Sequence, residues 1–314
     1  MTGWPPTGPA PLYPAWAWHR DARSVTRAAE ASSAHVRAVE DFVVRGNVHR
    51  ALCTHCGVVT RMVVDGGAML GEHINLREGL VCEGCGLNAR ARLLLHACDT
   101  VFPRRDARIA LLEAFSGLST IAAAKWPQVS CSEFFGGEAR PGEQASRVTA
   151  NGVVRSARHE DLTALSYADA SLDGIVHNDV LEHVPDTGAA LAQMLRVLRP
   201  GGCAVFTMPW FPWREATTVR GRIRADGSLE RLLPDEFHGD GLREEGIYTF
   251  YNFGADFGRM LADAGFDDIR FGVCYAPCCG FFSNNFRYGL DGLMLPTTIV
   301  ARRPVPTPSS MEST

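Results

Sequence analysis

Two C-x-x-C pairs are the feature that most restricts how this chain can fold. Cys53 and Cys56 form the first pair, Cys82 and Cys85 form the second, and a glycine follows each pair. A tetrahedral zinc ion takes four thiolates at about 2.3 Å, and each pair supplies two of them from one tight turn. Buried cysteines acting as small apolar residues are the alternative. The spacing predicts that both turns meet around one structural zinc ion in a zinc-ribbon-like module.

The N-terminal sequence and the hydropathy of the chain indicate the cellular compartment of the protein. The N-terminus lacks the basic start and continuous apolar segment of a secretory signal. No run approaches the roughly 18 apolar residues that a membrane-spanning helix needs. We therefore expect a cytoplasmic protein with no membrane association, in which the ten cysteines stay reduced.

Charge bears on nucleic-acid binding. A net charge of -4 argues against an evenly basic surface. One stretch is rich in arginine, and its ordinary interpretation is a solvated face, with nucleic-acid contact as the alternative. Its residues are Arg90, Arg92, Arg104, Arg105 and Arg108.

Length and pattern predict more than one unit, since 314 residues exceed what a single core usually organises. We expect an N-terminal arm and helix over residues 1–50 and the zinc module with a connecting helix over 51–103. A larger domain then covers 104–303, and a disordered tail rich in Pro, Ser and Thr covers 304–314.

The larger domain alternates short apolar runs with helical stretches. This alternation predicts an α/β fold, namely a Rossmann-like doubly wound, mostly parallel sheet with helices on both faces. The expected strands are Ile109–Leu112, Val129–Cys131, Gly174–Val176 and Cys203–Phe206, and the expected helices include Ile121–Trp126 and Leu191–Leu198.

Two acidic residues follow the first two expected strands. Glu113 and Gly117 lie in the turn that opens the first helix, where such a sheet presents its backbone to a ligand. A single glycine is a weak fingerprint, so an ordinary strand-to-helix turn is the alternative. Glu133 ends the next strand, where an acidic side chain can accept both hydroxyls of a ribose.

Three segments resemble the class I S-adenosylmethionine-dependent methyltransferases. They are Ala170–Asp186, Leu195–Gly202 and Met260–Phe266, and the resemblance extends over about residues 108 to 303. It implies that S-adenosylmethionine is the cofactor and that 104–303 is the catalytic domain. It also implies cofactor contacts from Glu113 and Gly117 (amino-acid and sulfonium end), Glu133 (ribose), Asp161 and Leu162 (adenine) and Asn178 (near the methyl group).

Histidines are the candidates for removing a proton from the acceptor, because they titrate near neutral pH. The candidates are His177, His183 and His238, each of which also has an ordinary structural interpretation. A further hypothesis places Asp179, Glu182 and His183 on one helical face and adds His238 to bind a divalent cation. That arrangement resembles metal-assisted O-methyltransferases acting on catechols and on RNA termini.

Aromatic residues are the candidates for an acceptor pocket, with core packing as the alternative. They are Trp210, Phe211, Trp213, Phe237, Tyr248, Phe250 and Tyr251. Cys274, Cys278 and Cys279 do not form a C-x-x-C pair and are interpreted as structural thiols.

Three functions remain open. The first is a methyltransferase for a small-molecule acceptor, in specialised metabolism. The second is an RNA methyltransferase that grips phosphates with the zinc module and the arginine stretch. The third is a methyltransferase-like binding protein without catalysis, which the single glycine of the Glu113–Ser119 turn would allow. Oligomeric state is not readable from these residues.

Overall fold

The computed structural model describes residues 16–149, 151–239, 243–287 and 289–306. For residues 31–35 it describes the backbone only. The expected arm, apart from its last residues, and the expected tail from 307 onward lie outside these ranges.

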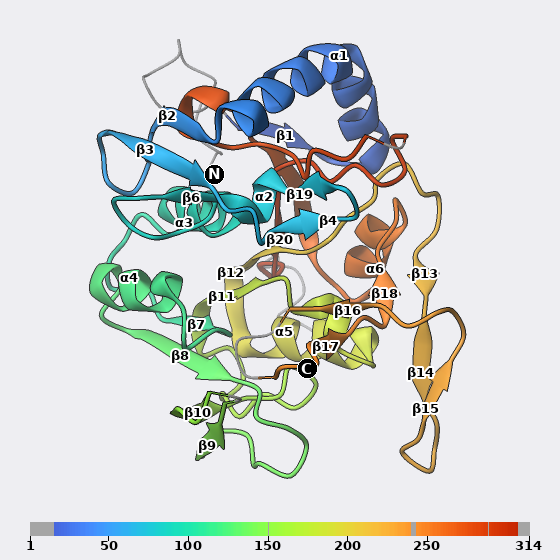
Figure 1. The fold of residues 1–314 in the computed structure, drawn as a ribbon. Coiled ribbons are helices and arrows are strands. Elements are labelled where there is room, and N and C mark those ends of the chain that lie inside the picture. The colour runs from blue at the N-terminus through green and yellow to red at the C-terminus, as the bar shows by residue number, and fades with distance from the viewer. Residues whose placement is uncertain (1–15, 150, 240–242, 288, 307–314) are drawn as a thin grey trace.

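A nine-stranded sheet forms the centre of the molecule, in the order β1-β19-β20-β12-β11-β7-β8-β10-β9 (Figure 1). The five strands from β12 to β10 are parallel, and antiparallel strands extend both edges. This confirms the Rossmann-like sheet. The strands are β1 (Ala17–His19), β7 (Ile109–Leu111), β8 (Val129–Glu133), β9 (Gln144–Val148), β10 (Val154–His159), β11 (Leu172–Asn178), β12 (Leu198–Thr207), β19 (Asp267–Val273) and β20 (Thr297–Arg302).

The order of the parallel strands reverses beside β7. The chain runs outward from β7 to β8 and β10, then returns to place β11 on the other side of β7, next to β12. Such a reversal separates the loops that follow β7 and β11. Ligands of open α/β sheets bind in that crevice, beyond the carboxyl ends of the strands.

Helices cover both faces, as a doubly wound sheet requires. Leucines of α3 and α4 pack on one face together with Val176 and Val205. Apolar residues of α1, α5 and α6 pack on the other face with Ile175 and Phe206. The helices are α1 (Ala22–Gly46), α3 (Ala89–Val101), α4 (Gly117–Lys125), α5 (Thr187–Val197) and α6 (Phe257–Asp263).

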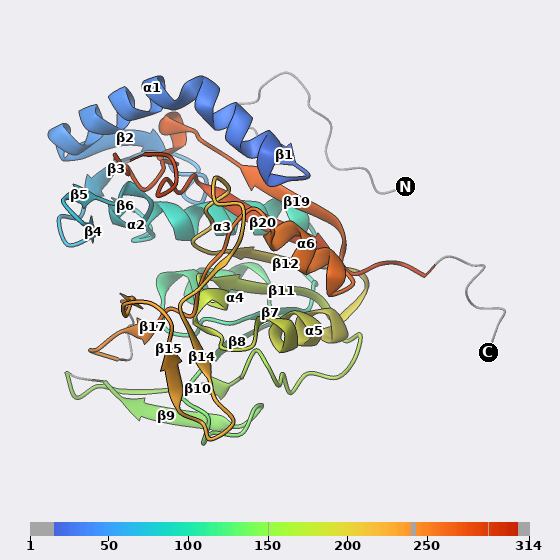
Figure 2. The same cartoon turned by 90° about the vertical axis from the view of Figure 1, so that its right-hand side faces the viewer.

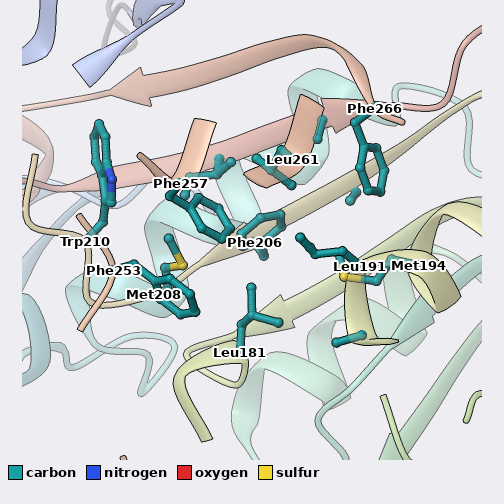
Figure 3. Close-up of a cluster of buried hydrophobic side chains, with 14 of the residues drawn as sticks. Leu181, Leu191, Met194, Phe206, Met208, Trp210, Phe253, Phe257, Leu261 and Phe266 are labelled. Atoms are coloured by element: carbon teal, nitrogen blue, oxygen red, sulfur yellow. The ribbon is translucent and has the colours of Figure 1, made fainter. Parts of the chain in front are cut away.

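The second of these clusters combines aliphatic side chains with aromatic residues and methionines. Figure 3 shows Phe206 of β12 lying among Phe257 and Leu261 of α6 and Leu191 of α5. Phe206 and Phe257 are fully buried. This packing holds the carboxyl-terminal halves of β11 and β12 in place. Asn178 and Thr207, described below, lie at the ends of these two strands.

The N-terminal module is a three-stranded ribbon, β2-β3-β6, with a short helix. Its apolar side packs against Val43 of α1 and Phe282, and α3 leads from it directly into the large sheet. Figures 1 and 2 both place α1 alongside this ribbon. Its elements are β2 (Val48–Leu52), β3 (Val59–Val64), β4 (Met69–Leu70), β5 (His73–Ile74), α2 (Leu76–Gly79) and β6 (Leu80–Cys82).

A long excursion separates β12 from α6 and forms three two-stranded ribbons. All of its described strands have only two or three residues, which is why no periodic pattern marks them in the sequence. They are β13 (Thr218–Val219) with β18 (Tyr251–Asn252), β14 (Gly221–Ile223) with β15 (Leu229–Arg231), and β16 (Phe237–His238) with β17 (Ile247–Tyr248).

Among the described residues, none of the helices combines the length and the apolar character needed to cross a lipid bilayer.

Candidate functional site

Polar side chains gather where the five parallel strands end. Glu113 follows β7, Glu133 ends β8, Asp161 follows β10, Asn178 ends β11 and Thr207 ends β12. Because parallel strands present their carboxyl ends at one edge, these five residues share the edge at which the strand order reverses. Four of them are the sequence-predicted cofactor residues; Thr207 was missed.

Asn178 links the two sides of the reversal. Its Nδ2 donates to Glu113 Oε2 at 3.3 Å, and its Oδ1 lies 2.8 Å from the Thr207 hydroxyl. That hydroxyl also lies 2.7 Å from Asp179 Oδ1, so its single proton can serve one acceptor at a time. The loops after β7, β11 and β12 are thereby joined by side-chain hydrogen bonds.

The turn after β7 opens α4 with a side-chain cap. The Ser116 hydroxyl accepts from the amides of Leu118 and Ser119. Gly117 is the first residue of the helix, and a Cβ there would lie 3.1 Å from Leu87, which follows the second cysteine pair. Glycine at this position therefore allows the cysteine module to approach the turn closely.

Glu133 and Asp161 stand on neighbouring strands farther from the reversal. The amide of Phe134 lies 3.3 Å from Glu133 Oε1. Asp161 Oδ1 accepts from the amide and hydroxyl of Thr163, which holds the loop after β10 in a tight turn. Leu162 is buried in the core, so only its backbone could face a ligand.

An ion-pair network that the sequence did not reveal joins the cysteine module to this edge. Arg77 of α2 donates two hydrogen bonds of 2.8 Å to the two oxygens of Asp179. Arg90 of α3 lies 3.4 Å from the same carboxylate and binds both oxygens of Glu78. The two arginines neutralise the two carboxylates, and they hold the pKa of Asp179 well below its usual range.

This network corrects two predictions. Asp179 has a positive φ of 52° and precedes a short 3-10 turn, η1 (Leu181–His183), so it does not share a helical face with Glu182 and His183. Arg90 does not lie on a solvated face, and Arg92 is fully buried against the carbonyls of Cys279 and Gly280. The other three arginines of the stretch remain at or near the surface.

The candidate histidines divide into two groups. His177 is fully buried, stacks on Phe206 with 4.5 Å between ring centroids, and has no hydrogen-bond partner among the described residues for either ring nitrogen. Burial lowers its pKa to about 3, so the ring is neutral. His177 is therefore a packing residue of the sheet, and its interpretation as a base is wrong.

His183 and His238 meet around Glu182. His183 belongs to η1 and His238 to β16 of the excursion, and their ring centroids lie 4.9 Å apart. Glu182 Oε1 lies 3.6 Å from His183 Nε2 and 3.6 Å from His238 Nδ1. The Glu182 side chain is fully buried, and neither oxygen has a hydrogen-bond partner among the described residues.

The four cysteines of the ribbon converge as predicted. Their sulfur atoms all lie within 4.8 Å of one another. The two turns repeat one geometry, with a 2.8 Å bond from the Gly57 amide to the Cys53 carbonyl and another from Gly86 to Cys82. Both glycines have positive φ, of 74° and 72°. A Cβ at Gly84 would lie 3.1 Å from the Cys56 sulfur. This donor set suits a tetrahedral, thiolate-binding metal ion.

The aromatic candidates are mostly structural. Trp210 stacks on Phe271 and donates its ring N–H to the Gly254 carbonyl. The Tyr248 hydroxyl is bound to the Arg220 carbonyl, and that of Tyr251 to the Pro185 carbonyl. The rest are Phe211 and Phe250, which are buried, Trp213, which is half-buried, and Phe237, which is half-exposed.

Of Cys274, Cys278 and Cys279, the first and the last fit their interpretation as structural thiols, whereas Cys278 is exposed. Cys274 and Cys279 are buried, and burial raises the pKa of both thiols.

Sequence comparison finds a family match for the centre of the chain. Residues 120–206 match the family described as methyltransferase domain. A 37.1 kDa protein of a Streptomyces fradiae transposon, described as uncharacterized, is 32% identical over 124 residues, which are 40% of this chain and 32% of that protein. An uncharacterized methyltransferase of Mycobacterium sp. strain KMS is 49% identical over 45 residues, 14% of this chain and 18% of that protein. The chain thus spans a third or less of the length of these relatives.

Solved structures show a more distant likeness. A S-adenosylmethionine-dependent methyltransferase of Methanosarcina mazei aligns at 14% identity over 65% of this chain and 95% of that one, with a TM-score of 0.36. The 1,6-didemethyltoxoflavin-N1-methyltransferase of Burkholderia thailandensis aligns at 16% identity over 69% and 79%, with a TM-score of 0.39. By sequence, then, residues 120–206, from within α4 to near the end of β12, match the methyltransferase-domain family, and in the structure they form part of a Rossmann-like sheet.

Proposed function

We propose that this protein transfers a methyl group from S-adenosylmethionine to a small-molecule acceptor. The observation that carries the proposal is the set of polar side chains at the carboxyl ends of five parallel strands, within and beside the methyltransferase domain. When bound, S-adenosylmethionine supplies an electrophilic methyl group on a sulfonium. Relatives from mycobacteria are named methyltransferases, which supports the same activity.

The side chains at the carboxyl ends of the parallel strands have the chemical groups that would bind S-adenosylmethionine. Glu133 ends β8, where a carboxylate can accept the two ribose hydroxyls. Glu113 lies in the turn between β7 and α4, and its carboxylate suits an ammonium or sulfonium group. Asn178, at the reversal, donates to the Glu113 carboxylate and holds it in place.

Alignment is the main task of such a site, because an in-line displacement needs the acceptor and the methyl group within about 3–3.5 Å and water excluded. The excursion between β12 and α6 supplies a cover, since His238 of β16 reaches Glu182 just beyond the end of β11. The Tyr251 hydroxyl binds the Pro185 carbonyl and ties the same excursion to the loop before α5.

A small molecule is preferred to RNA as the acceptor because three arginines of the module and its connecting helix are engaged inside the protein. Arg77, Arg90 and Arg92 bind carboxylates and carbonyls, and the net charge is -4. We further propose that zinc occupies the four-cysteine site and that its role is structural, since four sulfurs leave no open coordination position.

Calorimetric titration with S-adenosylmethionine and with S-adenosylhomocysteine tests the proposal. Micromolar binding is expected, weakened at least tenfold by Glu133→Ala and unchanged by Glu138→Ala, an exposed glutamate of the next loop. Absence of binding to both compounds would favour a non-catalytic binding protein. Salt-dependent binding of RNA would instead favour the RNA methyltransferase.

A further inference from the structure

The cluster of Glu182, His183 and His238 contains a buried carboxylate that the surrounding protein leaves unsatisfied. The Glu182 side chain is 0% exposed, and neither of its oxygens accepts a hydrogen bond from the described residues. Desolvating a carboxylate without a partner costs several kcal/mol or more, so buried charges are paired or coordinate metals. A proton on one of the two neighbouring histidines, or a bound cation in its place, can compensate this charge.

The hydrogen bonds of the two histidines orient their lone pairs. His183 Nδ1 lies 2.9 Å from the Tyr248 carbonyl oxygen, which can only accept, so Nδ1 carries the proton. His238 Nε2 lies 3.3 Å from Glu236 Oε1, which in turn accepts from the Asn252 amide at 3.0 Å. In neutral rings the other nitrogens, His183 Nε2 and His238 Nδ1, then direct lone pairs toward Glu182.

The distances within the cluster suit ligands of one ion better than hydrogen bonds. Both ring nitrogens lie 3.6 Å from Glu182 Oε1, beyond the 2.7–3.2 Å range of N–H···O bonds. Two ligands of a tetrahedral ion with bonds of about 2.0–2.2 Å are separated by roughly 3.3–3.6 Å. All three donor atoms lie within 4.8 Å of one another.

We propose that Glu182, His183 and His238 bind a divalent first-row transition metal ion, separate from the four-cysteine site. Two imidazoles and one carboxylate favour Zn²⁺, Mn²⁺ or Fe²⁺ over Mg²⁺ and Ca²⁺, which prefer oxygen ligands only. The Tyr248 carbonyl and the Glu236 carboxylate act as the outer hydrogen-bond partners that orient metal-binding histidines. Asp179, engaged by Arg77, takes no part.

Three protein ligands leave at least one coordination position open. His238 is 31% exposed, so that position faces the side of the cluster formed by the excursion. There the ion would take an oxygen or nitrogen atom of the acceptor and orient it. This assignment of the open position rests on the proposed methyl transfer, whereas the metal site does not.

Cobalt substitution tests the site without any methyl donor. The full-length protein is stripped of metal, loaded with Co²⁺ and desalted, and its bound cobalt and optical spectrum are measured. Wild type is expected to hold one equivalent more than Glu182→Gln and His238→Ala. The difference spectrum should show cobalt d–d bands without thiolate-to-cobalt charge transfer. His73→Ala, which alters a half-buried histidine of β5, should retain the full amount.

Equal cobalt in wild type and both site variants would overturn the proposal. If a variant fails to fold, Glu236→Gln takes its place, because it removes a charge only from the outer partner of His238. That change should weaken Co²⁺ binding by about 10–100-fold. An unchanged dissociation constant would also count against the site. A site that binds cobalt in a protein that binds no S-adenosylmethionine would uphold this inference and reject the proposed function.

Discussion

Arg77 of the cysteine module and Asp179 of the large sheet form a bidentate ion pair, with both N–O distances at 2.8 Å. Arg77 is 4% exposed and Asp179 is 14% exposed. The pair lies just beyond the carboxyl end of β11, at the point where the strand order reverses. The cysteine module is therefore attached to the candidate site itself and not to a remote surface.

Replacing Asp179 with a neutral side chain should strongly destabilise the protein. Asp179→Asn keeps the size of the side chain but leaves Arg77 and Arg90 with one carboxylate, that of Glu78, between them. Breaking a buried pair by removing one partner costs about 3–5 kcal/mol. Urea unfolding followed by circular dichroism should show a loss of that order.

An exposed ion pair provides the control for Asp179→Asn. Asp169 is 78% exposed and pairs with Arg196. Asp169→Asn should therefore cost no more than about 1 kcal/mol. Similar losses of unfolding free energy in the two variants would show that the Arg77–Asp179 pair is as accessible to solvent as the Asp169–Arg196 pair.

Burial of His177 predicts a pH dependence of stability. Its pKa is lowered from an ordinary value of 6.5 to about 3, chiefly by desolvation. Below pH 6.5 the unfolded chain therefore takes up a proton that the folded chain does not, and stability falls as the pH falls toward 3. The unfolded chain of the His177→Phe variant cannot take up this proton. Relative to wild type, the variant should gain up to about 1.4 kcal/mol per pH unit below pH 6.

The pH dependence of stability is compared between wild type and His177→Phe because another buried group, Glu40, changes stability with pH in the opposite direction. Burial raises the pKa of Glu40 to about 7, so its contribution to stability falls as the pH rises through that value. Glu40 is the same in both proteins and cancels in the difference. Parallel stability curves for wild type and His177→Phe between pH 4.5 and 7 would mean that His177 is not buried as a neutral ring.

The cysteine site predicts a local response to metal removal. The ribbon has a core of its own, which includes the sulfur atoms of Cys53 and Cys82, and structural zinc contributes directly to the folding of such modules. With a strong chelator, hydrogen exchange should accelerate in residues 48–86 before it accelerates in β11 and β12. Simultaneous acceleration in both regions would show that the ribbon does not open on its own.

The sequence predicted the parts of this structure that periodicity and spacing encode. Strands β7, β11 and β12 each contain a short apolar run, as buried parallel strands do, and each run lies where a strand was expected. The four cysteines converge because each C-x-x-C turn presents two sulfurs and the pairing of β2, β3 and β6 brings the two turns together. Glu113, Glu133, Asp161 and Asn178 share one edge because their strands are parallel.

Other parts depend on contacts that no local pattern records. Strand β10 alternates polar and small residues, because it pairs with the exposed β9, and it carries no apolar signal. The Arg77–Asp179 pair joins residues about a hundred positions apart, and nothing in either neighbourhood specifies the other. His177 was interpreted as a base because histidine titrates near neutral pH. Its place inside the sheet, stacked on Phe206, removes that property.

A glycine in the middle of β11 provides the last prediction. A Cβ added to Gly174 would lie 2.4 Å from Phe102 Cζ, closer than packed atoms can approach. Phe102 is 5% exposed and is enclosed by the cluster that joins α3, α4 and the sheet, so its ring has no room to withdraw. Gly174→Ala should therefore cost about 1–3 kcal/mol as an overpacked core.

The cause of that loss can be separated from a backbone effect by a double-mutant cycle. Phe102→Leu opens space opposite position 174, so adding Gly174→Ala to it should cost at least about 0.5 kcal/mol less than in wild type. Gly137→Ala, where a Cβ has nothing within 4 Å, should change the unfolding free energy by no more than about 0.5 kcal/mol. If the costs of Gly174→Ala and Phe102→Leu simply add, the loss comes from the strand backbone and not from contact with the Phe102 ring.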